Sequence, residues 1–365
     1  MNIKLSPLEM AELKKIIDSK DENISASDYL LSFLLDYPTE VDKAIIDKYA
    51  ARGLDEERAY ARAITNILAP NDKETSALII RHLNHHCAKL ANKKYAADPY
   101  YQNISFPNCS FGKWEIVRDI YRPYEAFAFR DIKISNLDFS EITQFGFFDK
   151  EFSFPAIEED GRVWMSITPH EIETMREAID AVSGTVVVMG LGLGYFPYMI
   201  ARKSAVKRII IVEKDAEVIG LFNEHLLHQF PNFDKIEIIE EDAFDYAREK
   251  LGDAKADYAF VDLWRSVDDG LELFAKMKAY EKKAPATKFI YWIEDSLLAM
   301  IRRIIITIFQ EALEGFASEN YERADRDQDR IFNELYHKME HQTFTTIEQI
   351  RAFLSRGSLS VLLSK

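Results

Sequence analysis

The feature that most constrains the fold is the stretch of residues 185–195, where a β-branched run leads directly into three alternate glycines. Residues 186–188 are all valine, which is typical of a strand buried on both faces, as in a parallel sheet. Gly190, Gly192 and Gly194 follow at once, and an apolar, helix-compatible run comes after them. Glycines at such a turn let the backbone approach a ligand closely, and a helix start offers free N–H groups. The stretch predicts a nucleotide-type cradle, although a tight strand-to-helix connection would show the same pattern.

Four more apolar segments further along the chain each end in acidic residues. Residues 208–212 are followed by Glu213 and Asp215, and residues 235–239 by Glu240, Glu241 and Asp242. Residues 258–261 are followed by Asp262, and residues 288–293 by Glu294 and Asp295. Helical segments separate them, at residues 216–230, 244–251, 267–282 and 296–315. Strands that alternate with helices predict right-handed crossovers and a parallel sheet, with ligands at the carboxyl ends of the strands. An acid at every strand end favours a binding site over solvated loop charge, and the position of Glu213 suits a grip on ribose hydroxyls.

These motifs resemble those of a known group of enzymes. The series is Gly190-Leu191-Gly192-Leu193-Gly194, Val212-Glu213-Lys214-Asp215, Glu241-Asp242-Ala243 and Phe260-Val261-Asp262. It resembles the class I S-adenosylmethionine-dependent methyltransferases, and within them it is most similar to the spermidine synthase branch. The resemblance covers roughly residues 147–309 and implies a doubly wound, mostly parallel sheet of the Rossmann-like methyltransferase type.

The resemblance also implies the cofactor, S-adenosylmethionine, and the residues that bind it. The glycine loop, with Gly190, Leu191, Gly192 and Gly194, would cradle the methionine part. Glu213, followed by Lys214, would hold the ribose diol. Asp242 would bind the adenine amino group with Ala243 beside it, and Asp262 would face the sulfonium or the acceptor.

Two departures from the family patterns bear on the reaction. Val188 stands where many methyltransferases carry an acid, a difference that the spermidine synthase branch shares. Arg265 stands where aminopropyltransferases carry the aspartate that deprotonates the amine. Because an arginine stays protonated at any accessible pH, it cannot serve as that base. Methyl transfer to an unidentified small-molecule acceptor is therefore the leading function, and aminopropyl transfer is the alternative.

Two other classes stay open. A nicotinamide-dependent dehydrogenase would need a third glycine at position 195, where the chain has Tyr195. A non-catalytic member of the fold would not need acids at every strand end. Both are less consistent with the sequence than a transferase.

Two residues are candidates for catalysis. Asp262 ends a predicted strand, so it should point at the crevice. His170 lies in the segment Thr168-Pro169-His170-Glu171 that leads into the cofactor strand, and it could act as a general base near neutral pH. The same segment also reads as a helix start, with Thr168 as cap, Pro169 as first residue and Glu171 closing a capping box.

The chain divides into four predicted segments. Residues 1–110 form an all-α N-terminal module, and residues 111–183 a small β region with a lead-in helix and a hairpin turn at residues 159–162. Residues 184–315 form the Rossmann-like domain that binds the cofactor, and residues 316–365 a helical extension with a candidate edge strand at residues 358–364.

Capping signals predict that the N-terminal helices start near Ser6, Ser25, Pro38 and Leu54, and that a further helix covers residues 76–90. This module is either an oligomerisation and lid element, compatible with a homodimer, or plain scaffold. His82 and His86 have i,i+4 spacing, but no third ligand at a defined spacing accompanies them, so no metal site is predicted.

Composition excludes several partner classes. The net charge is −15, from 46 basic and 61 acidic residues, which argues against general affinity for nucleic acids or anionic membranes. The two cysteines, Cys87 and Cys109, have no CxxC spacing. No apolar run reaches membrane-spanning length and the N-terminus does not read as a secretion signal, so a cytoplasmic protein is expected.

Overall fold

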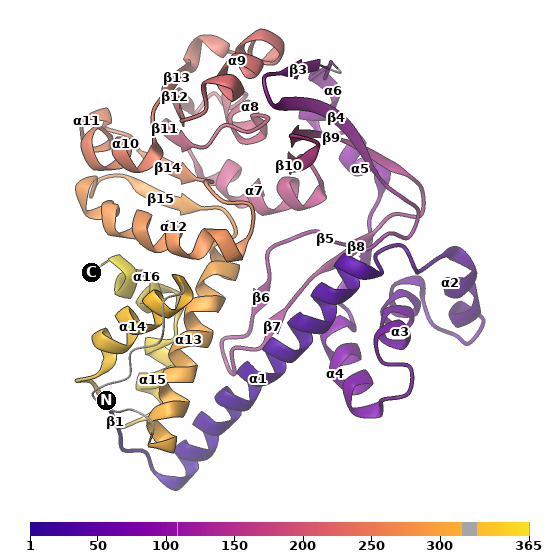
Figure 1. The fold of residues 1–365 in the computed structure, drawn as a ribbon, viewed down its shortest axis with the longest axis vertical. Helices are drawn as coiled ribbons and strands as arrows, with labels where there is room; N and C mark the ends of the chain where they lie inside the picture. The colour runs from indigo at the N-terminus through magenta and orange to yellow at the C-terminus, as the bar shows by residue number, and fades with distance from the viewer. Residues whose placement is uncertain (108, 316–326, 365) are drawn as a thin grey trace.

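The computed structural model describes residues 1–107, 109–315 and 327–364 (Figure 1). Its centre is a five-stranded, fully parallel sheet in the order β13-β12-β11-β14-β15. The strands are β11 (Gly184–Met189), β12 (Val206–Glu213), β13 (Ile236–Glu240), β14 (Tyr258–Val261) and β15 (Lys288–Tyr291). This is the doubly wound order of Rossmann-like sheets, so the predicted fold class is confirmed.

The β-branched run predicted as the cofactor strand forms the middle of this sheet. Val186, Val187 and Val188 in β11 are all buried, as a strand covered on both faces requires. Met189 pairs with Val212 of β12 on one side and with Val261 of β14 on the other. The three central strands therefore end together, which brings the residues that follow them to one edge of the sheet.

Helices supply the crossovers that parallel pairing requires. They are α7 (Pro169–Ala181), which leads into β11, α8 (Tyr195–Ala201), α9 (Ala216–His225), α10 (Ala243–Glu249) with the short α11 (Leu251–Ala254), α12 (Val267–Tyr280), and α13 (Glu294–Glu314) after β15. Short 3-10 turns follow α9 and α12, at Leu227–Gln229, Phe233–Lys235 and Glu281–Lys283. The predicted helices are present, and α9 ends earlier than expected, at His225.

A mostly antiparallel β region precedes the cofactor domain, as predicted. One sheet has the order β10-β9-β4-β3, formed by β3 (Cys109–Phe111), β4 (Trp114–Tyr121), β9 (Phe152–Glu159) and β10 (Arg162–Ser166). The predicted hairpin joins β9 to β10 through Asp160 and Gly161, both with positive φ. Smaller pairings involve β2 (Cys87–Lys89), β5 (Phe127–Ala128), β6 (Lys133–Ile134), β7 (Glu141–Ile142) and β8 (Phe145–Phe147).

The first N-terminal helix is longer than predicted. The capping box at Ser6 and Glu9 forms, but the helix start expected at Ser25 is wrong, because α1 runs without a break from Pro7 to Asp36. Ala26, Leu30 and Phe33 continue its buried stripe past Ser25, so packing overrides the local capping signal. In Figure 1 α1 is the long indigo helix, and it contacts α13.

The remaining N-terminal helices differ in part from the prediction. α2 (Lys43–Ala50) starts at the cap Asp42 and not at Pro38, whereas α3 (Glu56–Leu68) starts after Asp55 as expected. The helix predicted for residues 76–90 is wrong beyond Leu83: α4 (Lys73–Leu83) ends there, His85 adopts a left-handed conformation, and β2 follows. His82 and His86 therefore do not share a helix face. Two short helices, α5 (Asn92–Ala96) and α6 (Pro99–Asn103), complete the region.

The longer described elements of the C-terminal extension are helices. α14 (Asp327–Met339) and α16 (Arg356–Ser364) pack on α12 and α13, and α15 (Ile347–Phe353) contacts α1. The edge strand predicted at residues 358–364 is wrong, because Leu359 and Leu363 are spaced for one helix face and α16 buries both. β16 (Thr343–Phe344) pairs with β1 (Asn2–Ile3), which joins the two ends of the chain. Residues 316–326 of the predicted extension lie outside the described residues.

Apolar contacts cross the boundary that the sequence predicts at residue 110. The main core unites the parallel sheet with Leu13 and Ile16 of α1. A second core joins the later part of α1 and helices α2, α3 and α4 to Phe145 and Phe147 of β8. Within residues 1–107, 109–315 and 327–364, no helix combines the length and the apolar character that crossing a membrane requires.

Candidate active site

A cavity of about 940 Å³ lies at the carboxyl ends of the parallel strands. Its size is typical of small-molecule sites, and its position is the one where doubly wound sheets bind ligands. All the residues that the resemblance implies for the cofactor line this cavity, namely Gly190, Leu191, Gly192, Gly194, Glu213, Lys214, Asp242, Ala243 and Asp262. The structure thus brings together positions up to 72 residues apart, from Gly190 to Asp262.

The glycine loop lies directly against the end of β14. Gly190 has a φ of +96°, and a Cβ placed on it would be 2.1 Å from the carbonyl oxygen of Asp262. The Asp262 N–H donates to the Met189 carbonyl at 3.0 Å, and the Gly190 N–H donates to the Val212 carbonyl at 2.9 Å. Only glycine suits this position, because an L side chain would be strained in φ and would collide with backbone. The loop is also held from outside, since the Tyr100 hydroxyl donates to the Leu193 carbonyl.

Glu213 is buried at the end of β12, where backbone donors hold its carboxylate. One oxygen, Oε2, accepts from the Leu191 N–H at 3.1 Å, and Oε1 accepts from the N–H groups of Lys214 and Asp215 at 2.8 and 2.9 Å. The carboxylate is thereby fixed against the glycine loop. A carboxylate has about four acceptor sites, two on each oxygen, so these three hydrogen bonds leave one site, on Oε2, for a ligand.

Asp242 begins α10 as its cap. Its Oδ1 accepts from the Phe244 and Asp245 N–H groups at 2.8 and 3.3 Å, while Oδ2 takes no part in these two hydrogen bonds. Capping orients the side chain toward the cavity that Ala243 also lines.

A second carboxyl group, which the sequence did not assign to the site, lines the cavity with Asp262. It belongs to Glu171, in the first turn of α7. Burial raises the pKa of Asp262 to about 7. Burial and then the charge of Asp262 raise the pKa of Glu171 well above its ordinary value. Two desolvated carboxyls that face one cavity favour a state in which at least one of them is protonated.

The capping box predicted at this helix start does not form. Thr168 is the cap residue of α7, but its side chain makes no capping hydrogen bond, so Glu171 is not held at the helix end. Sequence reasoning missed Glu171 because the residues around it match a capping box, which accounts for an acid at this position without any role in the site.

His170, the other catalytic candidate, is not among the residues that line the cavity. Its ring lies edge-on to Trp292 at 5.9 Å between centroids, and within the described chain its Nδ1 has no hydrogen-bond partner. Burial lowers the pKa of His170 to about 4, so the ring is neutral near pH 7. The structure thus gives His170 a packing position behind the site.

The four tryptophans of the chain all line the cavity. They are Trp114 and Trp164 from the antiparallel sheet, and Trp264 and Trp292 from the ends of β14 and β15. The indole N–H groups of Trp114 and Trp264 are buried and lack a hydrogen-bond partner within the described residues. Aromatic rings and free donors from two separate sheets suit a flat or cationic ligand. No local spacing in the sequence connects these positions.

Arg265 lies at the exposed rim of this cavity. Its guanidinium pairs with Glu159 of β9 at 3.3 Å, and Lys113 pairs with the same carboxylate at 2.6 Å. The exposed side chain of Arg265 therefore links the end of β14 to the small β region.

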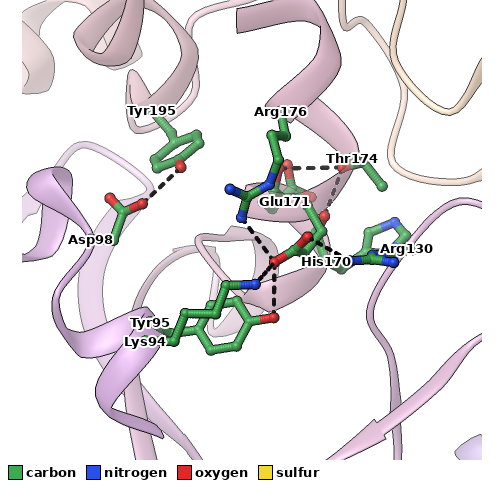
Figure 2. Close-up of polar contacts among 10 residues, drawn as sticks. Lys94, Tyr95, Asp98, Arg130, His170, Glu171, Thr174, Arg176 and Tyr195 are labelled. Carbon is green, nitrogen blue, oxygen red and sulfur yellow. Dashed lines mark hydrogen bonds and ion pairs between the residues drawn. The ribbon is translucent and has the colours of Figure 1, made fainter. Parts of the chain in front are cut away.

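Glu173, two residues beyond Glu171, has the opposite environment. Lys94, Arg130 and Arg176 converge on its carboxylate at 2.6, 3.2 and 2.9 Å, together with the Tyr95 hydroxyl at 3.0 Å (Figure 2). These partners outweigh burial and lower the pKa of Glu173 to about 2. Figure 2 also shows the Tyr195 hydroxyl donating to Asp98 at 3.1 Å, which ties the glycine loop to the segment before α6.

No protein-family model matches the chain, and no curated protein resembles it. Among solved structures, the chain is similar to spermidine synthase from Thermotoga maritima, with 16% identity and a TM-score of 0.30 over 42% of this chain and 60% of that one. It is similar in the same way to a spermidine synthase in complex with the transition-state analogue AdoDATO, with 17% identity and a TM-score of 0.30 over 42% and 59% of the two chains. A third similarity is to M. jannaschii TYW2 in complex with AdoMet, with 20% identity and a TM-score of 0.24 over 34% and 54%. The matches thus span about three fifths of the length of the spermidine synthases.

Proposed function

We propose that the protein is a cytoplasmic transferase that uses S-adenosylmethionine to methylate a small-molecule acceptor. The observation that carries this proposal is the single cavity around which the glycine loop, Glu213, Asp242 and Asp262 meet. The sequence motifs alone imply each contact separately, and the proposal is supported by the fact that these residues line one cavity.

The residues present fit this cofactor. Glu213 is held rigidly by three backbone N–H groups and retains one acceptor site, on Oε2, for a ribose hydroxyl. Asp242 has Oδ2 outside its capping hydrogen bonds, which suits an adenine amino group. Between them the glycine loop lacks side chains at Gly190 and Gly192, so the backbone itself forms the wall.

When bound, S-adenosylmethionine supplies an electrophilic methyl group on a cationic sulfur. The chain's own part is to orient that group and to exclude water around it, because methyl transfer depends mainly on alignment with the nucleophile. The acidic groups beside Asp262 and the tryptophan rings favour a cation at this point of the cavity.

Aminopropyl transfer is the second candidate, and one observation favours it. The sequence argued against it because Arg265 replaces the expected base, but Glu171 brings a carboxyl to the same cavity from α7. The two reactions need different cofactor forms, so binding can separate them.

The test is calorimetric titration with S-adenosylmethionine, S-adenosylhomocysteine, decarboxylated S-adenosylmethionine and NAD. We expect the first two to bind to wild type, and Glu213→Gln to weaken them by about tenfold or more, because one charged hydrogen-bonding partner is worth about 1.5–3 kcal/mol. Glu240→Gln is the matched control, since Glu240 is the exposed residue paired with Glu213 in the sheet register.

The outcomes separate the candidates. Preference for the decarboxylated form would favour aminopropyl transfer. Binding of NAD alone would show a dehydrogenase site, and binding of none of the four would contradict the enzymatic proposal.

A further inference from the structure

Glu171 and Asp262 are placed in the cavity by two independent parts of the fold. Asp262 directly follows β14, and its N–H donates to the Met189 carbonyl at 3.0 Å. The first turn of α7 is fixed by Thr174, whose hydroxyl bonds to the carbonyls of His170 and Glu171 at 2.7 and 3.3 Å. The Trp292 indole N–H donates to the same hydroxyl at 2.9 Å, which ties this turn to the end of β15. Figure 2 shows Thr174 beside Glu171 and His170 on this turn.

Neither carboxyl has a cationic partner among the residues that the structure describes. Within the described residues, Glu171 and Asp262 form no ion pair, whereas Glu173 on the same helix has three. Both residues are half-buried, and a carboxyl shielded in this way without a cation is costly to ionise beside a second one. Cations therefore compensate the charge of Glu173, two residues from Glu171, but no ion pair within the described residues compensates the two carboxyls that face the cavity.

The other titratable groups around the pair belong to every wall of the cavity. From the strand ends and the helices after them come Glu213, Lys214, Asp215, Glu241 and Asp242. From the rim come Lys113, Glu159, Arg265, Asp268 and Asp269.

Two of the three cations among these groups, Lys113 and Arg265, are engaged in ion pairs at the rim. Lys113 and Arg265 both pair with Glu159, and Lys113 also lies 3.9 Å from Asp215. Behind the pair, Tyr121 lies near Glu171, and burial raises the pKa of its hydroxyl, so it stays neutral like His170. Burial raises the pKa of Asp262 to about 7, and burial together with the charge of Asp262 raises the pKa of Glu171 well above its ordinary value.

We propose that Glu171 and Asp262 share one proton, and that the charge they retain accepts the proton which the acceptor releases during methyl transfer. The acceptor is then a molecule whose nucleophilic atom carries an N–H or O–H. This inference rests on the proposed function, because it takes S-adenosylmethionine to be the donor.

The step balances without a further reactant. The lone pair of the acceptor nitrogen or oxygen forms the bond to the methyl carbon, and the carbon–sulfur bond breaks with its electrons going to sulfur. S-adenosylhomocysteine leaves as a neutral thioether, and the proton from the acceptor passes to the carboxyl pair, which later releases it to water. A thioether or tertiary amine acceptor would have no such proton to give.

The test needs no acceptor, because the cofactor and its product differ in charge at the sulfur. A sulfonium close to the pair favours its ionised form, so binding of S-adenosylmethionine should release protons and strengthen as pH rises. We expect the ratio of the two affinities, S-adenosylmethionine over S-adenosylhomocysteine, to rise on the order of fivefold between about pH 6 and pH 8. Titration calorimetry in buffers of different ionisation enthalpy measures the released protons directly.

Variants assign this dependence to the pair. Glu171→Gln and Asp262→Asn should each shift the pH at which the affinity ratio changes, and the double variant should make the ratio independent of pH. An unchanged circular dichroism spectrum would show that the fold persists. Glu177 is an exposed acid on the same helix, and Glu177→Gln should leave the pH dependence of the affinity ratio as in wild type.

Two results would overturn the inference. If S-adenosylmethionine binds but the affinity ratio is flat with pH, or is unchanged in the double variant, the pair does not face the sulfur and the proposed function stands without it. If neither compound binds, both the inference and the proposed function fail.

Discussion

Replacing Gly190 by alanine tests the contact on which the geometry of the site depends. The new Cβ would lie 2.1 Å from the Asp262 carbonyl oxygen, roughly 1 Å inside an ordinary contact, and that neighbour is backbone that cannot rotate away. The φ of +96° adds about 1–2 kcal/mol of strain for an L residue. Relieving the overlap by moving the loop or the end of β14 should cost a further 1–3 kcal/mol or so, as in other overpacked sites. We expect a total loss of about 2–5 kcal/mol in the free energy of unfolding.

Gly53→Ala is the matched control, because Gly53 has a φ of +88° but nothing within 4 Å of a Cβ. It should lose the strain energy alone, about 1–2 kcal/mol. Urea unfolding followed by tryptophan fluorescence is the assay, and it reports this region because all four tryptophans line the cavity. Equal losses in the two variants would refute the close approach of the loop to β14.

Two further predictions concern the helices. Ser6→Ala should destabilise the protein by about 1 kcal/mol, because Ser6 caps α1. Ser25→Ala, in the interior of the same helix, should change the stability by less than about 0.5 kcal/mol. Similar losses for the two variants in urea unfolding would mean that a helix does begin at Ser25. Glu173→Gln should lower the stability by about 2 kcal/mol near neutral pH, since three cations depend on that carboxylate. The pKa of Glu173 is lowered to about 2 from an ordinary 4.5, so this contribution to stability is complete above about pH 4.5 and is lost as the pH falls toward 2. The difference in urea midpoint between the variant and wild type should therefore narrow on acidification. A difference that does not depend on pH would contradict the ion-pair account.

The parallel sheet could be predicted because its signals are local. The valines before Gly190 and the acids after each strand place β11 to β15 nearly where the structure has them. Buried parallel strands read as apolar runs, and the end of such a run fixes the acid at the sheet edge. The same logic located the residues around the cavity, although their roles as cofactor ligands stay a prediction.

The parts that the sequence did not predict depend on contacts between distant segments. Ser25 has a good capping signal, yet α1 continues because the buried stripe through Leu30 and Phe33 stabilises the helix more than a cap would. Residues 358–364 are apolar and short, and only packing on α12 and α13 decides that they form a helix. Glu171 sits in a sequence that matches a capping box, so its position in the cavity depends on tertiary structure that the motif does not contain.

The most direct measurement is a crystal structure of the protein with S-adenosylhomocysteine bound. The account predicts the ribose hydroxyls against Glu213, the adenine amino group at Asp242, and the thioether sulfur facing Asp262 and Glu171. A ligand bound elsewhere, or one whose sulfur points away from both carboxyls, would contradict it.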